Sequence, residues 1–316
     1  MMPYTELDKD MIVGLAKQFN IEDVLSFSLL SGGSENTNYL IASESGTYVL
    51  TICEQKSRTE TLNLCLLLEH LNNNGFLTSQ IIRNKDKEAV ILYKGKPVIL
   101  KSYLEGTIVQ DLSHDLLEQI GVQMGQLHHI DAPEYLPQKL GYGIECFDQI
   151  IHYAANSTFH KWLSRIKDQI RPYLTGTIPK SLIHSDIFYS NVIVQKEACK
   201  VHIMDFEEAA YYYRMFDVGM AIIGLCKEEQ HINLEKVSHL LSGYVQEICL
   251  TQEEQQALQP FTVYAAAAMS FWRHRNFTYT YPTPGMENHY LELKNIADFI
   301  NALPQDSFMQ ILREIA

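Results

Sequence analysis

The chain has 316 residues, of which 46% are hydrophobic and 20% charged, and a formal net charge of −13. This composition supports a sizeable core and argues against intrinsic disorder, and the length suits one large domain or two smaller ones. The acidic balance argues against a general nucleic-acid binder, because such a protein needs basic surface to displace the counterions of the phosphate backbone.

Membrane spans and paired cysteine motifs are both missing from the sequence. The longest apolar runs, such as Val218–Cys226, fall well short of the roughly 20 residues of a span, and the polar, acidic start is unlike a secretory signal. The six cysteines are scattered without a C-x-x-C pair, which is typical of reduced, mostly buried thiols rather than of a disulfide frame or a cysteine-based zinc site. We therefore expect a cytoplasmic protein whose partners are neither nucleic acid nor membrane.

Residues 1–106 alternate between helix and strand patterns. The breaks come from Asn36–Asn38, Ser43–Gly46, the C-cap cluster Asn72–Gly75 and the hairpin turn Lys94-Gly95. The expected elements are a helix over 8–19, strands over 27–30, 38–42 and 47–53, a helix over 60–73, and strands over 89–93 and 97–103. This order predicts a small sheet with one main helix against it.

Residues 107–316 are expected to form a second, mainly helical unit. A short β-like interruption spans 181–202 and reaches Phe206. The predicted helices begin near His114 and continue over 147–156, 158–174, 216–226, 234–246, 251–275 and 289–302. The boundary between the two units, over 102–106, is a predicted hinge. The fold class is therefore α+β with two lobes.

The strongest chemical signal is the segment Leu182–Val194, in which an apolar run delivers His184 and Asp186 and a second run begins after Asn191. A further apolar strand ends at Asp205, 19 residues after Asp186. Phosphoryl transfer needs a carboxylate to orient the attacking hydroxyl and take its proton, and oxygen ligands to hold Mg²⁺ on the nucleotide phosphates.

These residue types suit distinct roles. Asp186 suits the catalytic base, and Asn191 and Asp205 suit the metal ligands, because a hairpin returns Asp205 beside Asn191. His184 is expected to support the catalytic loop by hydrogen bonds rather than to react. The alternative is a polar β-hairpin whose Asp and Asn only cap turns.

The segments HSDIFYSN (184–191) and IMDFEEA (203–209) resemble the catalytic and metal-binding loops of the aminoglycoside phosphotransferase/choline kinase family. The resemblance implies a protein-kinase-like fold, with a nucleotide-binding lobe over 1–106, and ATP and Mg²⁺ as cofactors. Gln126-Leu127-His128 is similar to the family's helix that ends in Leu-His. The family resemblance also implies that Asp217 braces the catalytic loop, although a helix N-cap is the open alternative for this residue.

The segments SGGSENTNYLI (31–41) and YVLTI (48–52) resemble the kinase-like (type II) homoserine kinases. Two adjacent glycines among small polar residues can present backbone N–H groups to phosphates, although an ordinary β-turn has the same composition. In addition, the family resemblance implies that the hinge strand contacts adenine. The expected nucleotide-binding residues are Gly32, Gly33, Ser34, Asn36, Asn38, Ser102 and Leu104.

One departure from kinase-like enzymes concerns the strand lysine that holds the α- and β-phosphates. The alignment places Thr51 at that position, as in the homoserine kinase pattern, and neither Glu60 nor Glu69 has an evident strand lysine as partner. Lys101 lies close to the hinge, where a solvated strand-end lysine is the simpler interpretation.

Candidate substrate-binding residues are Tyr189 in the catalytic loop, Glu207 after the metal ligand, and Arg273 and Arg275 at the end of a helix. A carboxylate at 207 suits an ammonium group, and an arginine suits a carboxylate. Cations that stabilise a helix C-terminus are the alternative for the arginines.

We therefore expect an ATP- and Mg²⁺-dependent O-phosphotransferase for a small hydroxylated, amine-bearing substrate, with homoserine favoured. An aminoglycoside, choline or amino-sugar kinase and a non-catalytic nucleotide-binding protein are the alternatives. A protein kinase is disfavoured because no A-P-E signature follows Asp205.

Overall fold

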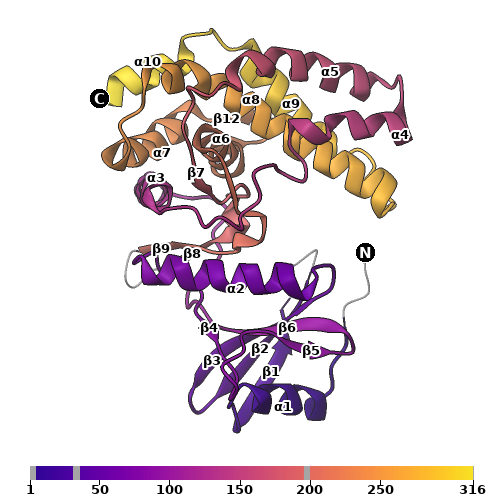
Figure 1. Cartoon of the computed structure of the whole chain (residues 1–316). Coiled ribbons are helices and arrows are strands. Elements are labelled where there is room, and N and C mark those ends of the chain that lie inside the picture. Colours follow the sequence, from indigo (N-terminus) through magenta and orange to yellow (C-terminus); the bar gives the residue numbers. More distant parts are fainter. Residues whose placement is uncertain (1–4, 31–35, 196–199, 316) are drawn as a thin grey trace. The chain divides into compact units, whose positions relative to one another are not determined.

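The structure, a computed structural model of the whole chain, describes residues 5–30, 36–195 and 200–315 (Figure 1). The chain divides into two compact units, residues 1–105 and 106–316. The first unit consists of α1 (Lys9–Gln18), β1 (Val24–Leu29), β2 (Asn36–Ser43), β3 (Gly46–Cys53), α2 (Arg58–Asn73), β4 (Ile81–Ile82), β5 (Ile91–Tyr93) and β6 (Lys96–Ser102).

The first unit is an antiparallel sheet in the order β1-β2-β3-β6-β4, with β5 paired to β6. Helices α1 and α2 lie against opposite faces of the sheet, and side chains of α1 share a core with alternate residues of β2, β3 and β6. The predicted strands are confirmed. The predicted break at Asn36–Asn38 is wrong, because β2 already begins at Asn36, and β4 was too short to give a pattern.

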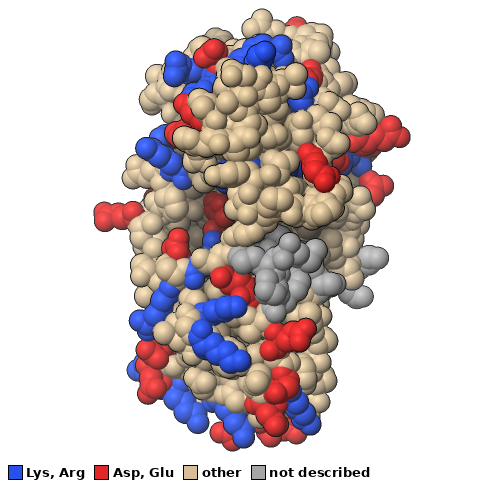
Figure 2. Space-filling view, turned by 90° about the vertical axis from the view of Figure 1, so that its right-hand side faces the viewer, with Lys and Arg blue, Asp and Glu red and all other residues tan. Residues whose placement is uncertain are grey.

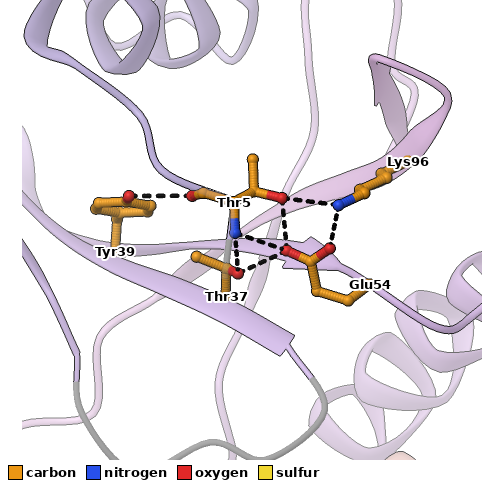
Figure 3. A network of polar contacts seen from close by, with 5 residues as sticks. All are labelled: Thr5, Thr37, Tyr39, Glu54 and Lys96. Atoms are coloured by element: carbon orange, nitrogen blue, oxygen red, sulfur yellow. Dashed lines mark hydrogen bonds and ion pairs between the residues drawn. The ribbon is translucent and has the colours of Figure 1, made fainter. Parts of the chain in front are cut away.

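A polar network ties the start of the described chain to this sheet (Figure 3). The buried carboxylate of Glu54 accepts hydrogen bonds from Thr5 and Thr37 at 2.6 Å and pairs with Lys96. Tyr39 adds a bond from its hydroxyl to the Thr5 carbonyl at 3.1 Å. The network therefore joins the ends of β2, β3 and β6 to the segment before α1.

The second unit is mainly helical. Its helices are α3 (His114–His129), α4 (Ile151–Ala154), α5 (Thr158–Ile170), α6 (Arg214–Leu225), α7 (Leu234–Glu247), α8 (Gln252–Arg275), α9 (Tyr290–Ala302) and α10 (Ser307–Ile315). Within the described residues its strands form three antiparallel pairs, β7 (Lys180–Ile183) with β10 (Ala210–Tyr213), β8 (Val192–Gln195) with β9 (Lys200–Ile203), and β11 (Lys227–Glu228) with β12 (His231–Ile232). Shorter turns are 3₁₀ helices at Ile144–Ile150, Arg171–Tyr173, Tyr189–Asn191 and Phe206–Glu208, and a π-helix at Asn276–Thr280.

The buried α8 runs through this unit with α6 and α9 against it. The predicted helices are confirmed except over 147–156, where a 3₁₀ turn at Ile144–Ile150 precedes the short α4. The sequence patterns did not predict α10. They also missed β10, because four residues are too few to show the alternation of buried and exposed side chains that marks a strand. These strand pairs matter because the H-x-D-x-x-x-x-N motif lies between β7 and β8, and β9 leads to Asp205.

Gly106 is fixed within the second unit rather than acting as a free joint. Its φ is +140°, and a Cβ there would lie 2.5 Å from Ile193 Cγ2 and 2.7 Å from the Val194 carbonyl oxygen. The next residue, Thr107, exchanges backbone hydrogen bonds with Val194 at 3.0 and 2.9 Å. The segment after the predicted hinge is thus anchored to β8.

No helix in the described parts of the chain is long and apolar enough to cross a membrane. On the face that Figure 2 shows, Lys and Arg side chains lie interspersed with Asp and Glu. This mixture accords with the acidic net charge of −13.

Candidate active site

The H-x-D segment leaves β7 in a strained turn that one buried carboxylate holds. Ser185 has a φ of +67°, which is unfavourable for a residue with a side chain. Asp217, on α6 and fully buried, accepts hydrogen bonds from the backbone N–H of His184 at 3.0 Å and of Ser185 at 2.6 Å. The carboxylate therefore fixes the backbone immediately before Asp186.

A histidine and a tyrosine hold that carboxylate in turn. His128, near the end of α3, lies with Nε2 3.1 Å from Asp217 Oδ2 and Nδ1 2.9 Å from the Tyr244 hydroxyl. Because a carboxylate only accepts, Nε2 carries a proton and donates it to Asp217. The His128–Asp217 pair is completely buried, so its geometry is set by packing rather than by solvent.

Tyr142 clamps the same turn from the other side. Its buried hydroxyl donates to the Ser185 carbonyl at 2.7 Å and lies 3.1 Å from Ser185 Oγ, which itself donates to the Glu208 carbonyl at 2.6 Å. Burial, together with the negative charges of Asp186 and Glu208, raises the pKa of Tyr142 well above its usual value. The hydroxyl thus remains a donor across the whole working pH range.

Asp186 and Asn191 are joined within the loop. The amide nitrogen of Asn191 donates to the Asp186 carbonyl at 2.8 Å and to Asp186 Oδ2 at 3.1 Å. The described hydrogen bonds of this side chain use its nitrogen. Asp186 is half-buried, so its carboxylate remains accessible.

Asp205 reaches the same place through the β8–β9 hairpin. Val192 pairs with Ile203 in this hairpin, and the Met204 N–H donates to the Asn191 carbonyl at 2.9 Å. His184 Nε2 lies 2.8 Å from the Met204 carbonyl and therefore donates to it. The loop carrying Asp205 is thus bonded to the loop carrying Asp186.

The donor set fits a hard divalent cation. Asp205 is exposed, with a φ of +70° that turns the chain sharply after β9, and Asn191 offers an amide oxygen. Carboxylate and carbonyl oxygens are the ligands that Mg²⁺ prefers.

In the first unit, the predicted Gly32, Gly33 and Ser34 lie outside the described residues. Asn36 is buried at the start of β2. Asn38 lies opposite Thr51 across β2 and β3, and its Oδ1 accepts from the Thr51 hydroxyl at 2.7 Å. The position that the sequence alignment assigns to the kinase lysine therefore carries the buried Thr51, in a neutral hydrogen bond with the half-buried Asn38.

The two α2 glutamates have partners other than a strand lysine. Glu60 forms the capping box of α2 with Ser57, which lowers the pKa of Glu60. Glu69 forms a bidentate pair with Arg83, with both N–O distances at 2.7 Å. Sequence patterns missed Arg83 because it lies in an irregular segment after the two-residue β4.

The two residues predicted to contact adenine, Ser102 and Leu104, differ in their hydrogen bonds. The Ser102 N–H donates to the Gln80 carbonyl at 2.8 Å, and its hydroxyl accepts from the Gln80 N–H at 2.8 Å. Within the described residues the Leu104 amide has no hydrogen-bond partner. Leu104 is the better candidate to pair with a base.

The two arginines predicted to bind substrate, Arg273 and Arg275, differ in their partners. Arg273 pairs with Glu292 at 2.6 Å. Arg275 donates to the neutral Gly141 carbonyl at 3.0 Å and Gln149 Oε1 at 2.9 Å. Its guanidinium also lies over the Phe271 ring, 5.1 Å from the centroid. Within the described residues Arg275 thus forms no ion pair, and it lies next to the segment that carries Tyr142.

The remaining predicted substrate residues lie beside the catalytic loop. Tyr189 begins the 3₁₀ turn that ends at Asn191, and Glu207 is half-buried within the turn after Asp205. Sequence patterns missed Glu145, whose carboxylate is exposed although its Oε1 lies 3.3 Å from the hydroxyl of Tyr212. Only the fold brings Glu145 near β10, so no local signal could reveal it.

Residues 26–257 match the model of the APH phosphotransferase enzyme family. The chain belongs to this family. It is 28% identical to the homoserine kinase of Paramagnetospirillum magneticum over 298 residues (90% of this chain, 91% of that one), and 26% identical to the homoserine kinase of Nitrobacter hamburgensis over 271 residues (82% and 81%).

Two solved structures show the same fold. A microcompartment-associated aminopropanol kinase superposes with a TM-score of 0.74 at 14% identity, covering 96% of this chain and 100% of that one. The amicoumacin kinase hAmiN, in complex with AMP-PNP and Ca²⁺, gives a TM-score of 0.73 at 17% identity, covering 96% and 97%. The predicted protein-kinase-like fold is confirmed, and the chain is a small-molecule kinase that phosphorylates a hydroxyl group.

Proposed function

We propose that this phosphotransferase is an ATP- and Mg²⁺-dependent homoserine kinase. The observation that carries the proposal is the joining of Asp186, Asn191 and Asp205 by the loop contacts of Asn191 and Met204. The curated relatives support the acceptor, because homoserine kinases match this chain over 80% or more of its length.

In this proposal the loop residues have different roles in phosphoryl transfer. Asp186 accepts a hydrogen bond from the acceptor hydroxyl, orients it for in-line attack and takes its proton. Asn191 Oδ1 and the Asp205 carboxylate hold Mg²⁺, which neutralises charge on the nucleotide phosphates. Asp217 and Tyr142 act as positioning residues, since their hydrogen bonds hold His184 and Ser185, the two residues before Asp186.

The acceptor is a zwitterion, so it needs both a cation and an anion in its site. Arg275 is the proposed carboxylate ligand, because its described partners are neutral whereas Arg273 is paired with Glu292. Glu207, with Glu145 as an additional candidate, is placed to attract the ammonium group. Tyr189 in the catalytic loop is the proposed wall of the acceptor site.

A coupled assay of ADP release tests the proposal with homoserine, 1-aminopropan-2-ol, choline and an aminoglycoside as acceptors. We expect homoserine to give the highest kcat/KM. Asp186→Asn should lower kcat by about 10²–10⁴-fold, the usual contribution of a general base. The matched control is Asp168→Asn, which removes an exposed carboxylate on α5 and should leave turnover unchanged.

The acceptor panel separates the alternatives. No stimulation of ATP use by saturating homoserine would reject that acceptor, and turnover of an amino alcohol or aminoglycoside instead would point to another branch of the family. ATP binding without turnover of any acceptor would favour a non-catalytic nucleotide-binding protein.

Arg275→Gln tests the carboxylate ligand within the same assay. The change should raise KM for homoserine about tenfold or more, in keeping with the loss of a charged hydrogen bond. KM for 1-aminopropan-2-ol, which has no carboxylate, should stay the same. An equal rise for both acceptors would assign Arg275 a purely structural role.

A further inference from the structure

A cluster of metal-ligand side chains lies on the second unit, on elements that carry none of the proposed catalytic residues. It consists of His114, the first residue of α3, and of Glu235 and His239 on α7. Glu235 and His239 are four residues apart and so share one helix face. One ligand atom from each of the three side chains lies within 4.8 Å of the other two.

The three ligand atoms lie close enough to share one ion, and they form no hydrogen bond with one another. The imidazole rings of His114 and His239 are stacked with centroids 4.0 Å apart and planes 15° apart. His114 Nδ1 lies 3.9 Å from Glu235 Oε1, which is too long for a hydrogen bond. Two ligands of a tetrahedral ion with bonds of about 2.0–2.1 Å are roughly 3.3 Å apart. Because the lone pair of an imidazole nitrogen lies in the plane of its ring, the two stacked rings have to turn about their Cβ–Cγ bonds before both can bind one ion.

The backbone that carries the cluster is rigid. Helices α3 and α7 pack so closely that a Cβ on Gly243 would lie 1.9 Å from the Glu118 carbonyl oxygen, and one on Gly121 would lie 2.1 Å from the Leu240 carbonyl oxygen. These glycine contacts fix the separation of the two helices. The backbone positions of the three ligands are therefore fixed before any ion binds, and only the side chains have to reorient.

The local charges also permit a cation. The neighbouring Lys236 pairs with Asp111 at 2.6 Å and lies 3.5 Å from Glu228, so its charge is compensated. Glu235 is 70% exposed on its side chain and His114 41%, which lets an ion and a coordinating water reach the cluster. Glu235 supplies the negative charge that offsets the positive ends of two helices.

We propose that His114, Glu235 and His239 bind a divalent transition-metal ion of the Zn²⁺ class, with water completing the coordination. Two imidazoles and one carboxylate suit Zn²⁺, Ni²⁺ or Cu²⁺, whereas Mg²⁺ prefers oxygen ligands alone. The ion would link the first turns of α3 and α7 and stabilise the folded chain. This inference does not rest on the proposed acceptor or on catalysis.

Binding of Zn²⁺ and Co²⁺ to chelator-stripped protein tests the site, with excess Mg²⁺ present and at about pH 7.5, where histidine is mainly neutral. We expect one tight equivalent by calorimetry, visible absorption bands on Co²⁺ binding, and a Zn²⁺-dependent rise in Tm. His239→Ala and Glu235→Gln should weaken binding at least about tenfold and abolish the Co²⁺ bands. Circular dichroism checks that both variants fold.

His152→Ala is the matched control, because it removes an exposed histidine outside the cluster, and it should bind as the wild type does. Equal Zn²⁺ affinity in the wild type and in His239→Ala would overturn the proposal. So would Co²⁺ binding without its visible bands, or a Tm that Zn²⁺ does not raise. An Asp186→Asn variant that retains the bands would show that the bound ion is independent of catalysis.

Discussion

The turn after β7 and the facing strands β2 and β3 illustrate two ways of building a site. At the turn, charged groups hold the backbone, since the buried Asp217 binds two successive N–H groups and His128. On the strands, Thr51 and Asn38 form a neutral pair where related enzymes use a lysine.

The difference matters because removing a partner from a buried charge costs more folding free energy than removing one from a neutral hydrogen bond. Removing one member of a buried charged group leaves the others unpaired, which costs several kcal/mol. Breaking a neutral hydrogen bond costs only the desolvation of one group. Catalytic geometry should therefore be more sensitive to mutation at the turn than at the strands.

The largest effect is expected from Asp217→Asn. The amide nitrogen would face one of the two backbone N–H groups, so one bond is lost and a donor meets a donor. Unfolding free energy should fall by about 3 kcal/mol or more, and kcat by about 10²-fold, because Asp186 loses its fixed position.

Urea unfolding and steady-state kinetics measure both changes. The control is Asp168→Asn, which should stay within about 0.5 kcal/mol of the wild type, as exposed substitutions usually do. Wild-type kcat in Asp217→Asn would contradict the positioning role.

Local sequence patterns were enough to predict most helices and strands of both units. They also predicted the β8–β9 hairpin, because apolar runs and turn residues are short-range signals. They could not show that Tyr142 bonds Ser185, or that Arg83 pairs with Glu69, since those contacts join segments that only the tertiary fold brings together. The roles of the catalytic and metal-binding residues remain predictions.

A smaller effect is expected from Thr51→Val, which keeps the shape of the side chain and removes its hydroxyl. Asn38 Oδ1 would lose its partner in a half-buried position, so unfolding free energy should fall by about 1 kcal/mol. The kcat should change far less than in Asp217→Asn, because no described contact joins Thr51 to the turn after β7.

Thr51→Ser is the matched control, since it retains the hydroxyl. A loss of kcat in Thr51→Val as large as that in Asp217→Asn would show that the neutral pair is as critical as the buried carboxylate.

The smallest effect concerns Glu54 and depends on pH. Burial alone would raise the pKa of Glu54, but hydrogen bonds from Lys96, Thr37 and Thr5 outweigh it and hold the pKa below the usual value of 4.5. A lowered carboxyl pKa contributes stability that is present above the unfolded-state value and is lost as the pH falls through the folded-state value.

Glu54→Gln should therefore lower the unfolding free energy at neutral pH by about 1 kcal/mol, because Lys96 is 40% exposed and water screens the pair. The gap between variant and wild type should narrow as the pH falls below about 4.5, where the wild-type carboxyl takes up a proton. Denaturation curves across this range, with Glu22→Gln as an exposed control, measure the gap. A gap that stays constant with pH would mean that hydrogen-bond geometry alone, and not the charge of Glu54, secures the segment before α1 to the sheet.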